Sequence, residues 1–427
     1  MRTGIDIAQT ARFETLSKKD AFLKKVFTGA ERDYFASRKH NIKTIAGNFC
    51  AKEAFFKALG TGIGPFGFLD VAVLRDAHGK PYFSLSQPLN AFIKTLGITQ
   101  FDVSISHDGG YAVASVAAHC DARFSAYVHA AKKSETNDAG VISNALAKSI
   151  LPVRSQNSHK GSFGKDYIVA GSKGLTGAAV LCSSACLHSG AGLITLGCPE
   201  SLNIVFETVL TEVMTDPLPD AGGHLCAAGA ERMLARAKKS DAVLFGCGLG
   251  NTPDTYRLLE ALIGQTCVPL VLDADGINAL AGNINILNRH KQELVITPHL
   301  VEFTRLAGCS LTELSRAPEV FAAAFSKQYG VTLVLKSHQT LAALPDGRVF
   351  KNVLGNSGMA TGGSGDVLAG VITAFLGQGV CAQKSALLGV YVHSLAADMA
   401  AADKGEYGLT PTDIVKTLPY ALNFLGG

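Results

Sequence analysis

Five short apolar runs between residues 167 and 336 constrain the fold of this chain more than any other feature of its sequence. Each run is followed by glycine or polar residues and then by a helical pattern, and the runs lie at 167–171, 242–246, 269–273, 294–297 and 332–336. Apolar runs that alternate with helices are typical of an α/β domain with a central, mostly parallel sheet, because such strands are buried on both faces. The later part of the chain therefore predicts a doubly wound domain.

Sheets of this kind bind ligands beyond the carboxyl ends of their strands, where consecutive strand ends meet. The residues that follow the five runs are therefore candidates for one shared crevice. They are Gly171, residues 246–250, residues 273–275, His299 and Lys336.

A glycine-rich segment at 356–370 is the strongest candidate for chemistry. Its small residues surround one carboxylate, Asp366, and an apolar helical pattern follows at once. Glycine lets the backbone approach a ligand closely, and the amides at a helix N-terminus favour a phosphate or a developing oxyanion. Asp366 stands where a base facing that anion would have to be. The alternative is a glycine-rich turn in which Asp366 only caps the helix.

Two further strand ends carry polar side chains. His299 precedes Glu302 by one helical turn, and it is either a binding residue at the crevice or a structural cap. The lysine at the end of the last run is followed by four polar residues that suit the phosphates of a nucleotide. These five are Lys336, Ser337, His338, Gln339 and Thr340. The glycine-rich loop at 246–250 is a weak signal by itself.

The first 118 residues predict a separate α+β domain. Alternating strand patterns at 101–106 and 111–116 flank a turn that contains His107, which predicts a hairpin. Helical patterns run over residues 19–34 and 45–59, and the second stops at a glycine.

The length of 427 residues is too great for one ordinary core. The polar piece at 132–138 has no periodicity and is typical of a linker. We therefore predict domains at 1–118 and 139–427, joined by a linker at 119–138.

Composition narrows the class of protein. Hydrophobic residues make up 47% and charged residues 17%, as in a packed globular protein. No apolar run looks long enough to span a bilayer and no signal peptide is evident, so we expect no membrane association. The ten cysteines include no CxxC pair, which predicts a reducing, cytoplasmic location without disulfides.

Charge is concentrated in the first domain. Residues 1–118 carry 15 Lys and Arg against 10 Asp and Glu, a net charge of +5. Such an excess indicates an acidic partner, although a solvated surface explains it equally well. No dense basic stripe with interleaved aromatic residues is present, so we expect no nucleic-acid partner.

Two carboxylates of the first domain are candidate metal ligands. Asp6 lies in an apolar strand pattern and Glu53 lies in a helical pattern, and hard oxygen ligands of this kind suit a magnesium–pyrophosphate site. The alternative for Glu53 and Lys57, at i and i+4, is a solvated helix face. His107 could equally be a simple turn residue.

The C-terminal motifs together resemble the ADP-dependent NAD(P)H-hydrate dehydratases of the ribokinase-like superfamily. The matching segments are residues 158–164, 176–179, 246–250, 297–299 and 356–366. The resemblance implies repair of hydrated NADH or NADPH (NADHX or NADPHX): ADP phosphorylates the ring hydroxyl, and phosphate elimination restores the reduced dinucleotide, leaving AMP.

The same resemblance implies roles for individual residues. Ala178, Gly248, His299 and Asp366 would contact the hydrated dinucleotide, with Asp366 as the base. The five residues from Lys336 to Thr340, together with Gly365, would contact the AMP part of ADP, and Mg²⁺ would bridge the phosphates. The chain departs from the family pattern at Leu300-Val301 and at Ser337, where the family has more flexible residues. The rival interpretation is an ATP-dependent small-molecule kinase of the same fold.

The N-terminal motifs resemble holo-acyl-carrier-protein synthase. They are Gly4-Ile5-Asp6, the helical pattern from Lys52 to Gly62, Gly79-Lys80-Pro81 and the strand that ends at His107. The resemblance implies transfer of 4′-phosphopantetheine from coenzyme A (CoA) to a serine of acyl carrier protein. Asp6 and Glu53 would bind Mg²⁺, Lys57 and His107 would be catalytic, and Arg12 would meet the acidic carrier.

One departure of this domain concerns CoA. The family commonly has arginine where this chain has Asn48, which predicts weaker affinity for a CoA phosphate. The family is typically trimeric, so we expect a homo-oligomer. The alternative is an N-terminal domain that serves only as an oligomerisation module, but the retained Asp6, Glu53, Lys57 and His107 favour an enzyme.

Overall fold

The structure is a computed structural model, and it describes residues 1–62, 64, 66–135, 138 and 140–426. The chain forms two compact units, Met1–Ser125 and Ala126–Gly427, called here the N-terminal and C-terminal units. The end of the expected linker at 136–137 lies outside the described residues, and so do the limits of the expected second domain, Ala139 and Gly427.

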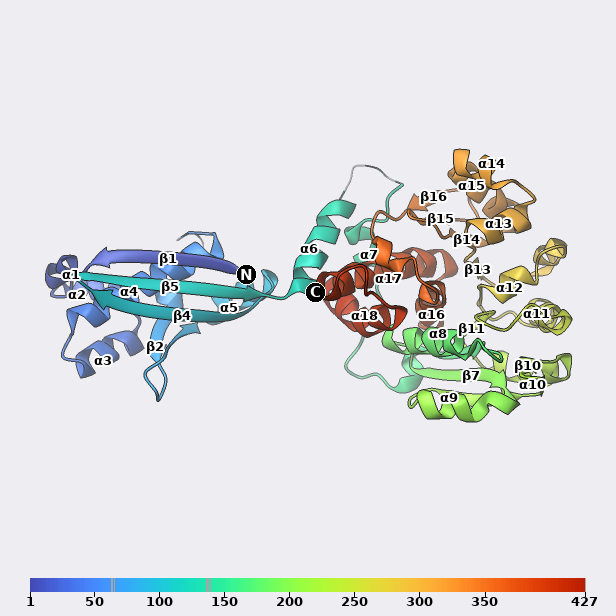
Figure 1. Cartoon of the computed structure of the whole chain (residues 1–427), viewed down its shortest axis with the longest axis horizontal. Coiled ribbons are helices and arrows are strands. Elements are labelled where there is room, and N and C mark those ends of the chain that lie inside the picture. The colour runs from blue at the N-terminus through green and yellow to red at the C-terminus, as the bar shows by residue number, and fades with distance from the viewer. Residues whose placement is uncertain (63, 65, 136–137, 139, 427) are drawn as a thin grey trace. The chain divides into compact units, whose positions relative to one another are not determined.

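The N-terminal unit packs helices against a three-stranded antiparallel sheet of order β1-β5-β4, with a separate β2-β3 hairpin (Figure 1). Its strands are β1 (Arg2–Gln9), β2 (Val71–Arg75), β3 (Pro81–Leu85), β4 (Ile98–Asp108) and β5 (Tyr111–Cys120). Its helices are α1 (Ala11–Leu16), α2 (Asp20–Val26), α3 (Gly29–Ser37), α4 (Ile42–Leu59) and α5 (Gln87–Thr95).

Helix α4 is the core of the N-terminal unit, and its ends follow from sequence. The Asn41 side chain accepts hydrogen bonds from the amides of Lys43 and Thr44, which caps the first turn. Gly60, at φ +77°, takes the left-handed conformation that ends the helix. The predicted helix at 45–59 is thus confirmed, with one additional turn at its start.

The helical pattern at 19–34 is interrupted, contrary to the expectation of one helix. Thr28 and Glu31 form a capping box, in which each side chain accepts the other's backbone amide. This box starts α3 and separates it from α2. The pattern of apolar residues could not show the break, because both helices face the same core.

The C-terminal unit holds a nine-stranded sheet of order β16-β15-β14-β13-β12-β11-β6-β7-β8, in which β15 runs antiparallel to the other strands. Its strands are β6 (Lys165–Val169), β7 (Leu193–Pro199), β8 (Met214–Leu218), β11 (Ala242–Phe245), β12 (Leu270–Leu272), β13 (Leu294–Ile296), β14 (Thr332–Leu335), β15 (Leu341–Ala343) and β16 (Val349–Lys351). A small hairpin, β9 (Asp220–Ala221) and β10 (His224–Leu225), lies outside this sheet.

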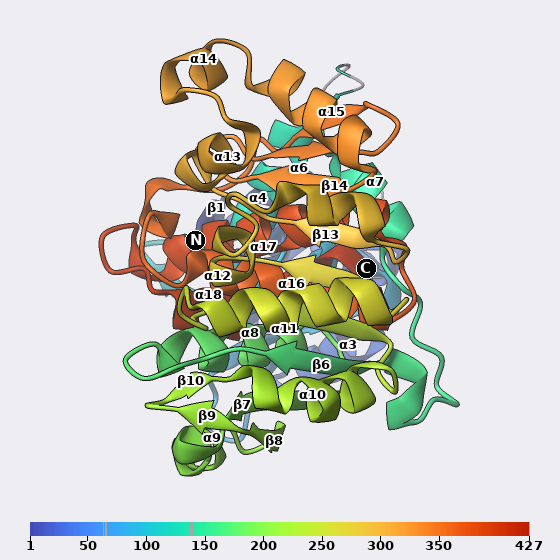
Figure 2. The ribbon, with the colours of Figure 1, turned by 90° about the vertical axis from the view of Figure 1, so that its right-hand side faces the viewer.

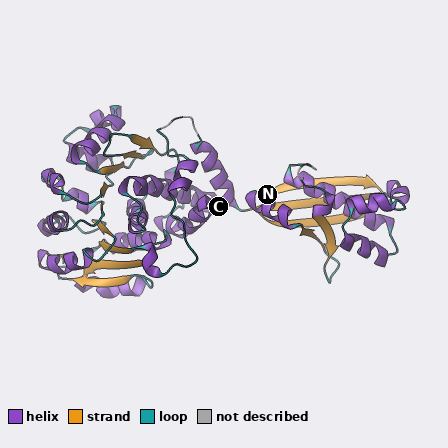
Figure 3. Ribbon diagram, turned by 180° about the vertical axis from the view of Figure 1, so that it is seen from behind, coloured by secondary structure: helices purple, strands orange, loops and turns teal. Residues whose placement is uncertain are grey.

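Helices cover both faces of this sheet (Figure 3). Those on one face, turned toward the viewer in Figure 2, include α10 (Ala230–Ala237), α11 (Pro253–Gln265), α12 (Asp275–Asn278), α13 (Leu300–Ala307), α14 (Leu311–Arg316) and α15 (Pro318–Tyr329). Those on the other face include α7 (Asn144–Ile150), α8 (Thr176–His188), α16 (Ser364–Gly377), α17 (Ala382–Lys404) and α18 (Pro411–Gly426). A further helix, α9 (Asn203–Val209), contacts the edge strand β8.

Alternate residues of each strand enter different cores, which explains the unbroken apolar runs. In β11, Ala242 and Leu244 pack with α8 and α16, while Val243 and Phe245 pack with α10 and α11. A strand buried on both faces needs apolar residues at every position. All five predicted strands are present, and the predicted α+β and α/β classes are confirmed.

In the nine-stranded sheet, the strands that were not predicted from the sequence are β7 and β8 at one edge and β15 and β16 at the other. Strands β15 and β16 have three residues each, too few for a periodic pattern. Helix α6 (Ala122–Ser134) occupies most of the expected linker at 119–138.

The expectation that no segment is long and apolar enough to span a bilayer is wrong for helix α17. By length and composition alone it could cross a membrane, but 83% of its apolar window is buried inside the unit. A central core helix of a large α/β unit needs the same composition.

Candidate active site

The carboxyl ends of the central strands of the C-terminal unit meet at Asp273. This carboxylate follows β12 and is almost fully buried. Its Oδ1 atom accepts hydrogen bonds from Lys336 Nζ at 2.6 Å and from Thr297 Oγ1 at 2.7 Å. Because Lys336 follows β14 and Thr297 follows β13, three neighbouring strands contribute to one ionic contact. The expected convergence of strand ends is therefore present.

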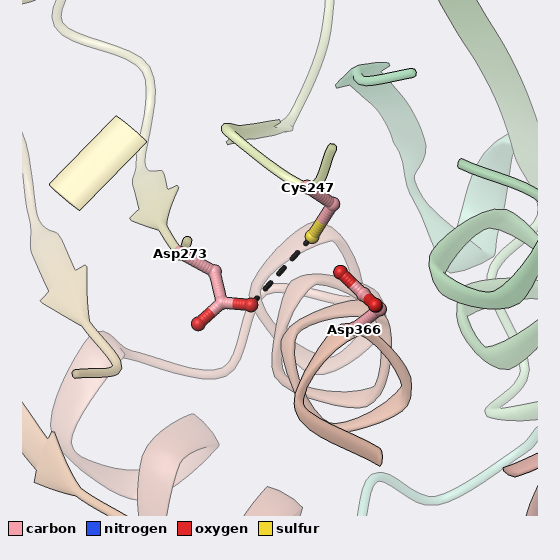
Figure 4. Close-up of side chains that lie close together, drawn as sticks. All are labelled: Cys247, Asp273 and Asp366. Carbon is pink, nitrogen blue, oxygen red and sulfur yellow. Dashed lines mark hydrogen bonds between the residues drawn. The ribbon is translucent and has the colours of Figure 1, made fainter. Parts of the chain in front are cut away.

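Asp366 lies in the first turn of α16, beside this contact. Gly363 precedes the helix at φ +104° and, as a glycine, has no side chain with which to cap the first turn. The carboxylates of Asp366 and Asp273 and the thiol of Cys247, which follows β11, all lie within 4.8 Å of one another. Figure 4 shows the Cys247 sulfur beside both carboxylates, with Sγ at 3.7 Å from Asp273 Oδ2.

The two carboxylates have different electrostatic surroundings. Burial and the negative charge of Asp273 raise the pKa of Asp366 to about 6, against the opposing effects of the Cys247 thiol and of Lys336. Burial lowers the pKa of Lys336, but the charges of Asp273 and Glu302 outweigh it, so the net shift is upward. Lys336 therefore stays an ammonium ion paired with Asp273, and Asp366 is left as the carboxylate able to exchange a proton near neutral pH.

The group of Cys247, Asp273 and Asp366 does not fit a resident metal ion. Interaction with Cys182, burial and the nearby carboxylates raise the pKa of Cys247 well above its usual range. Metals bind the thiolate, which this environment disfavours. In addition, Lys336 already neutralises Asp273.

His299 has two structural roles: it caps α13, and its side chain lines a cavity. Its Nδ1 accepts hydrogen bonds from the amides of Val301 and Glu302, and the carboxylate of Glu302 accepts the His299 amide at 2.8 Å. The imidazole remains half-exposed and lines a cavity of about 870 Å³. The cap and the binding role proposed from sequence are therefore compatible.

The cavity runs from the strand ends toward α16 and α17. Of the predicted nucleotide contacts, Lys336, Ser337, His338, Thr340 and Gly365 line it, whereas Gln339 is not among its lining residues. A Cβ atom on Gly365 would lie 3.1 Å from Lys336 Nζ, so glycine there leaves room for the lysine against the helix. The rest of the wall is mixed. Its apolar side chains come from Leu354, Met359, Leu368 and Val390, and its polar ones come from Asn356, Ser357, Thr361, Ser364, His393 and Ser394.

Ala178 and Gly248 lie together, away from the lining of this cavity. Gly248, at φ +63°, follows β11, and a Cβ atom on it would lie 2.8 Å from the Cβ atom of Ala178 in the first turn of α8. Ser172 fixes the loop, because its Oγ donates to the Gly248 carbonyl at 2.8 Å. Both residues thus lie at the same end of the sheet as Asp366, on the α8 side.

A second group of charged residues lies in the N-terminal unit. Asp6 in β1 accepts a hydrogen bond from Lys57 Nζ in α4 at 2.8 Å. Burial and the Asp6 charge raise the pKa of Glu53, and Lys57 opposes that shift. Gly4 makes this approach possible, since a Cβ atom on it would lie 2.1 Å from the Ala54 carbonyl oxygen of α4.

Among the described residues, no hydrogen bond or ion pair joins His107 or Arg12 to this group. His107 pairs with Ala112, which pairs with Ala8, so His107 shares the sheet face of Asp6 but lies two strands away. Arg12 lies exposed in α1. The sequence therefore brings Asp6, Glu53 and Lys57 together but leaves the other two apart.

Asn48, at the position of the family's arginine, is fully buried. Its amide group donates to the Val73 carbonyl at 2.9 Å, and its Oδ1 accepts from Arg75 at 3.0 Å. Asn48 is thus a packing residue of a polar network beneath α4 and cannot reach a ligand as it stands.

Comparison with known proteins identifies the family of the C-terminal unit. Residues 167–420, more than half of the chain, match the family model described as NAD(P)H-hydrate dehydratase. The chain belongs to the NAD(P)H-hydrate dehydratase family. Residues 2–131 match a second model, that of the 4′-phosphopantetheinyl transferase superfamily.

Two relatives from the dehydratase family align with similar shares of this chain but with different shares of their own length. The bifunctional NAD(P)H-hydrate repair enzyme Nnr of Moorella thermoacetica is 38% identical over 286 residues, which cover 67% of this chain and 54% of that protein. The ADP-dependent (S)-NAD(P)H-hydrate dehydratase of Streptococcus thermophilus is 32% identical over 287 residues, which cover 65% of this chain and 96% of that protein. The chain thus spans about half the length of the bifunctional relatives that it matches.

A solved structure also matches the dehydratase part. The ADP/ATP-dependent NAD(P)H-hydrate dehydratase from Bacillus subtilis, co-crystallised with ATP and Mg²⁺, aligns with a TM-score of 0.59 and 26% identity. The alignment covers 68% of this chain and 100% of that one.

Asp273 and Cys247 lie within the candidate segments 273–275 and 246–250, and Thr297 lies at the end of a predicted strand, but the sequence assigned none of the three an individual role. The position of each after a strand was the signal, and it does not show which side chains meet. His393 also lines the cavity, from the buried middle of α17.

Proposed function

We propose that the C-terminal unit restores NADH or NADPH from their hydrated forms, with ADP as the phosphate donor. The ring hydroxyl attacks the terminal phosphorus of ADP, the bond from that phosphorus to the bridging oxygen breaks, and AMP leaves. Loss of phosphate from the ring, with a ring proton, re-forms the double bond. The observation that carries this proposal is the position of Asp366, in the first turn of α16 behind Gly363 and next to Gly365, which lines a nucleotide-sized cavity.

Asp366 takes the proton of the attacking hydroxyl in this proposal. Its pKa of about 6 lets it be ionised at neutral pH and still hold a proton, which suits a general base. The amides of the α16 N-terminus would stabilise charge on the phosphoryl group in flight. Lys336, which follows β14, would add a positive charge next to the same phosphoryl group.

ADP would bind in the cavity, with its phosphates at the Lys336 end. Lys336, Ser337, His338, Thr340 and Gly365 line that part of the wall, and Gln339 would contribute through its backbone. The apolar part of the wall would receive the base. Mg²⁺ would accompany the phosphates and offset their charge.

The hydrated dinucleotide would approach from the α8 side. Ala178 and Gly248 offer a surface without long side chains there, and His299 would contact the ring portion from α13. Leu300 and Val301 replace the family's flexible residues after His299. The capping bonds of His299 persist in spite of them, so local contacts would change more than the activity.

Incubation of the full chain with hydrated NADH tests this function. With ADP we expect NADH to be recovered with equal amounts of AMP and phosphate. ATP without ADP measures the nucleotide preference. Phosphorylation of a small alcohol by ATP, without any NADH recovery, would support the kinase alternative instead.

For the N-terminal unit we propose transfer of 4′-phosphopantetheine from CoA to acyl carrier protein. The match to the transferase superfamily and the meeting of Asp6, Glu53 and Lys57 support it. Asp6 and Glu53 supply oxygen ligands that suit a hard divalent cation. Burial and the Asp6 charge raise the pKa of Glu53, and Lys57 offsets this only in part. Mg²⁺ held there would neutralise the pyrophosphate of CoA.

Lys57 and His107 would assist the carrier serine, with His107 moving in from its exposed strand end. Arg12 would attract the acidic carrier from the surface of α1. Asn48 would leave CoA with one phosphate contact fewer, which predicts a weaker affinity.

A homo-oligomer is part of this proposal. Ile5 and Ile7 of β1 are 63% and 61% exposed, on the sheet face opposite α4. An exposed apolar sheet face of this kind supports association between copies. Addition of CoA and acyl carrier protein to the full chain distinguishes a transferase, which yields modified carrier, from a module that only associates.

A further inference from the structure

A carboxylate of helix α17 holds the start of the glycine-rich segment. Asp398 lies in the second half of α17 and is partly buried. Its Oδ2 accepts a hydrogen bond from the Gly355 amide at 3.0 Å, and its Oδ1 accepts one from Asn356 Nδ2 at 2.9 Å. The two donors precede Asp398 by 43 and 42 positions of sequence, so a local pattern could not predict this contact.

The backbone of residues 355–359 is held at three further points. Gly355 is at φ +105°, a conformation that other residues rarely adopt. Asn356 Oδ1 accepts a hydrogen bond from the Gly358 amide at 3.1 Å, so Asn356 uses one end of its amide group toward α17 and the other toward its own segment. A second carboxylate, Glu406 just after α17, accepts hydrogen bonds from the amide and the hydroxyl of Ser357.

This segment and the two residues after it form a large part of the cavity wall. Six lining residues come from it: Gly355, Asn356, Ser357, Met359, Ala360 and Thr361. Asp398 and Glu406 are not among the lining residues. The two carboxylates therefore act on a ligand in the cavity only through the segment that they hold.

We propose that Asp398 is a positioning residue for nucleotide binding, which holds residues 355–359 in the conformation that forms one wall of the cavity. A wall that is fixed before the ligand arrives costs less ordering free energy on binding. Without Asp398 the nucleotide must order the segment itself, so its affinity should fall while Asp366 and Lys336 stay in place. The inference rests on the part of the proposed function that places a nucleotide in the cavity, and not on hydrate repair itself.

Exchange of Asp398 and Asn356 gives a reciprocal test. The Asp398 carboxylate accepts two hydrogen bonds, so Asp398→Asn replaces one acceptor by an NH₂ group that faces another donor. Asn356→Asp alone places two carboxylates together. In the swap, which combines both substitutions, the new amide can accept from Gly355 and donate to the new carboxylate, and that carboxylate can still accept from Gly358. Each hydrogen bond is then restored with its partners exchanged.

Equilibrium binding of ADP and of ATP to the full chain, with Mg²⁺ and without hydrated substrate, measures the effect. Asp398→Asn should weaken both about 10-fold, because a hydrogen bond to a charged group is lost. The swap should bind better than either single variant and within about 3-fold of wild type. At saturating ADP, kcat for NADH recovery by Asp398→Asn should fall by less than about 3-fold, since the reacting groups are unchanged.

Asp216→Asn is the matched control. Asp216 in β8 is a buried carboxylate that also accepts two hydrogen bonds, from Tyr167 Oη at 3.0 Å and from Arg232 Nε at 2.8 Å, and it is not a lining residue of the cavity. We expect a comparable loss in the midpoint of unfolding with unchanged nucleotide affinity. Wild-type nucleotide affinity in Asp398→Asn, or a swap that binds no better than the single variants, would overturn the positioning role.

Hydrogen exchange separates failure of this inference from failure of the proposed function. In the nucleotide-free chain, the amides of residues 355–359 should exchange faster in Asp398→Asn than in wild type, and the swap should slow them again. A wild-type chain that binds nucleotide but recovers no NADH contradicts hydrate repair and not the positioning role. A wild-type chain that binds neither ADP nor ATP contradicts both. Wild-type exchange rates in Asp398→Asn contradict the positioning role, whatever the activity proves to be.

Discussion

Asp273 and Asp366 show how two neighbouring carboxylates receive different roles from their surroundings. Asp273 is held by an ammonium and a hydroxyl, so its charge is balanced within the protein. No ammonium or hydroxyl group of the described residues forms a hydrogen bond with Asp366, and burial and the charge of Asp273 raise its pKa to about 6. Surroundings that balance the charge of one carboxylate and not that of its neighbour separate a structural acid from a reactive one.

Asp366→Asn should make the C-terminal unit more stable at high pH. A carboxyl whose folded-state pKa is raised binds its proton more tightly in the folded state, and the stability that this gives at low pH is lost as pH rises through about 6. Asparagine carries no such penalty, so we expect a gain on the order of 1–3 kcal/mol near pH 8 and almost none near pH 4. Denaturant unfolding at both pH values measures it.

The control for this experiment is Glu319→Gln, in the exposed first turn of α15. It should show no gain that depends on pH. An equal gain in Asp366→Asn at both pH values would mean that burial does not raise this pKa.

Arg12→Glu should weaken capture of acyl carrier protein more than turnover of bound CoA. An exposed charge that meets an acidic partner acts mainly through association, so the defect should shrink as salt is raised. Steady-state kinetics at several ionic strengths measure this, with Lys94→Glu on α5 as a second exposed cation. A defect of equal size at every salt concentration argues against a carrier contact.

At the scale of elements, the contact of β1 with α4 decides the geometry of the N-terminal site. Gly4 lets the strand lie against the helix backbone, and Asp6, two residues on, then reaches Lys57. The register of β1 on β5 fixes which side chains face the helix.

Gly4→Ala should therefore destabilise the N-terminal unit and abolish transfer, without changing hydrate repair. The new Cβ atom would meet the Ala54 carbonyl oxygen and the Ala58 amide, which are backbone atoms that cannot give way. We expect a loss of roughly 1–3 kcal/mol or more, as for other overpacked sites. Gly67→Ala is the matched control, because a Cβ atom there meets nothing within 4 Å. Similar losses in the two variants would contradict this account of β1 packing.

The elements of the sequence that carried local signals were predictable, and those fixed by long-range contacts were not. The apolar composition of residues 242–245 predicts a strand that is buried on both faces, and Gly60 predicts the end of a helix. The break between α2 and α3 depends on one reciprocal cap. Strand β15 forms by pairing with β14, and β16 forms by pairing with β15. For the same reason Asp366 was found from its glycines, whereas the Lys336–Asp273 ion pair, across 63 positions of sequence, was not.

At the scale of the whole molecule, the two candidate sites lie in separate compact units. Each has its own hydrophobic core and its own carboxylates. Substitutions in one unit should therefore leave the chemistry of the other unchanged.

Asp6→Ala and Glu53→Ala test this independence from the N-terminal side. Each should weaken the apparent affinity for Mg²⁺ in phosphopantetheine transfer by on the order of 100-fold or more, because a direct ligand is lost. Hydrate repair by the same preparations should match wild type. An unchanged dependence of transfer on Mg²⁺ concentration in either variant would show that the metal assignment is wrong.

Asp366→Asn in the full chain tests the central claim most directly. Asparagine is nearly isosteric with aspartate but cannot accept the hydroxyl proton, so NADH recovery from its hydrate should fall by roughly 10²–10⁴-fold. Binding of ADP and transfer of phosphopantetheine by the same preparation should persist, since the α16 amides and the N-terminal unit are untouched. Asparagine caps a helix as well as aspartate does. Unchanged NADH recovery in Asp366→Asn would therefore mean that Asp366 is only a helix cap, and would contradict this account.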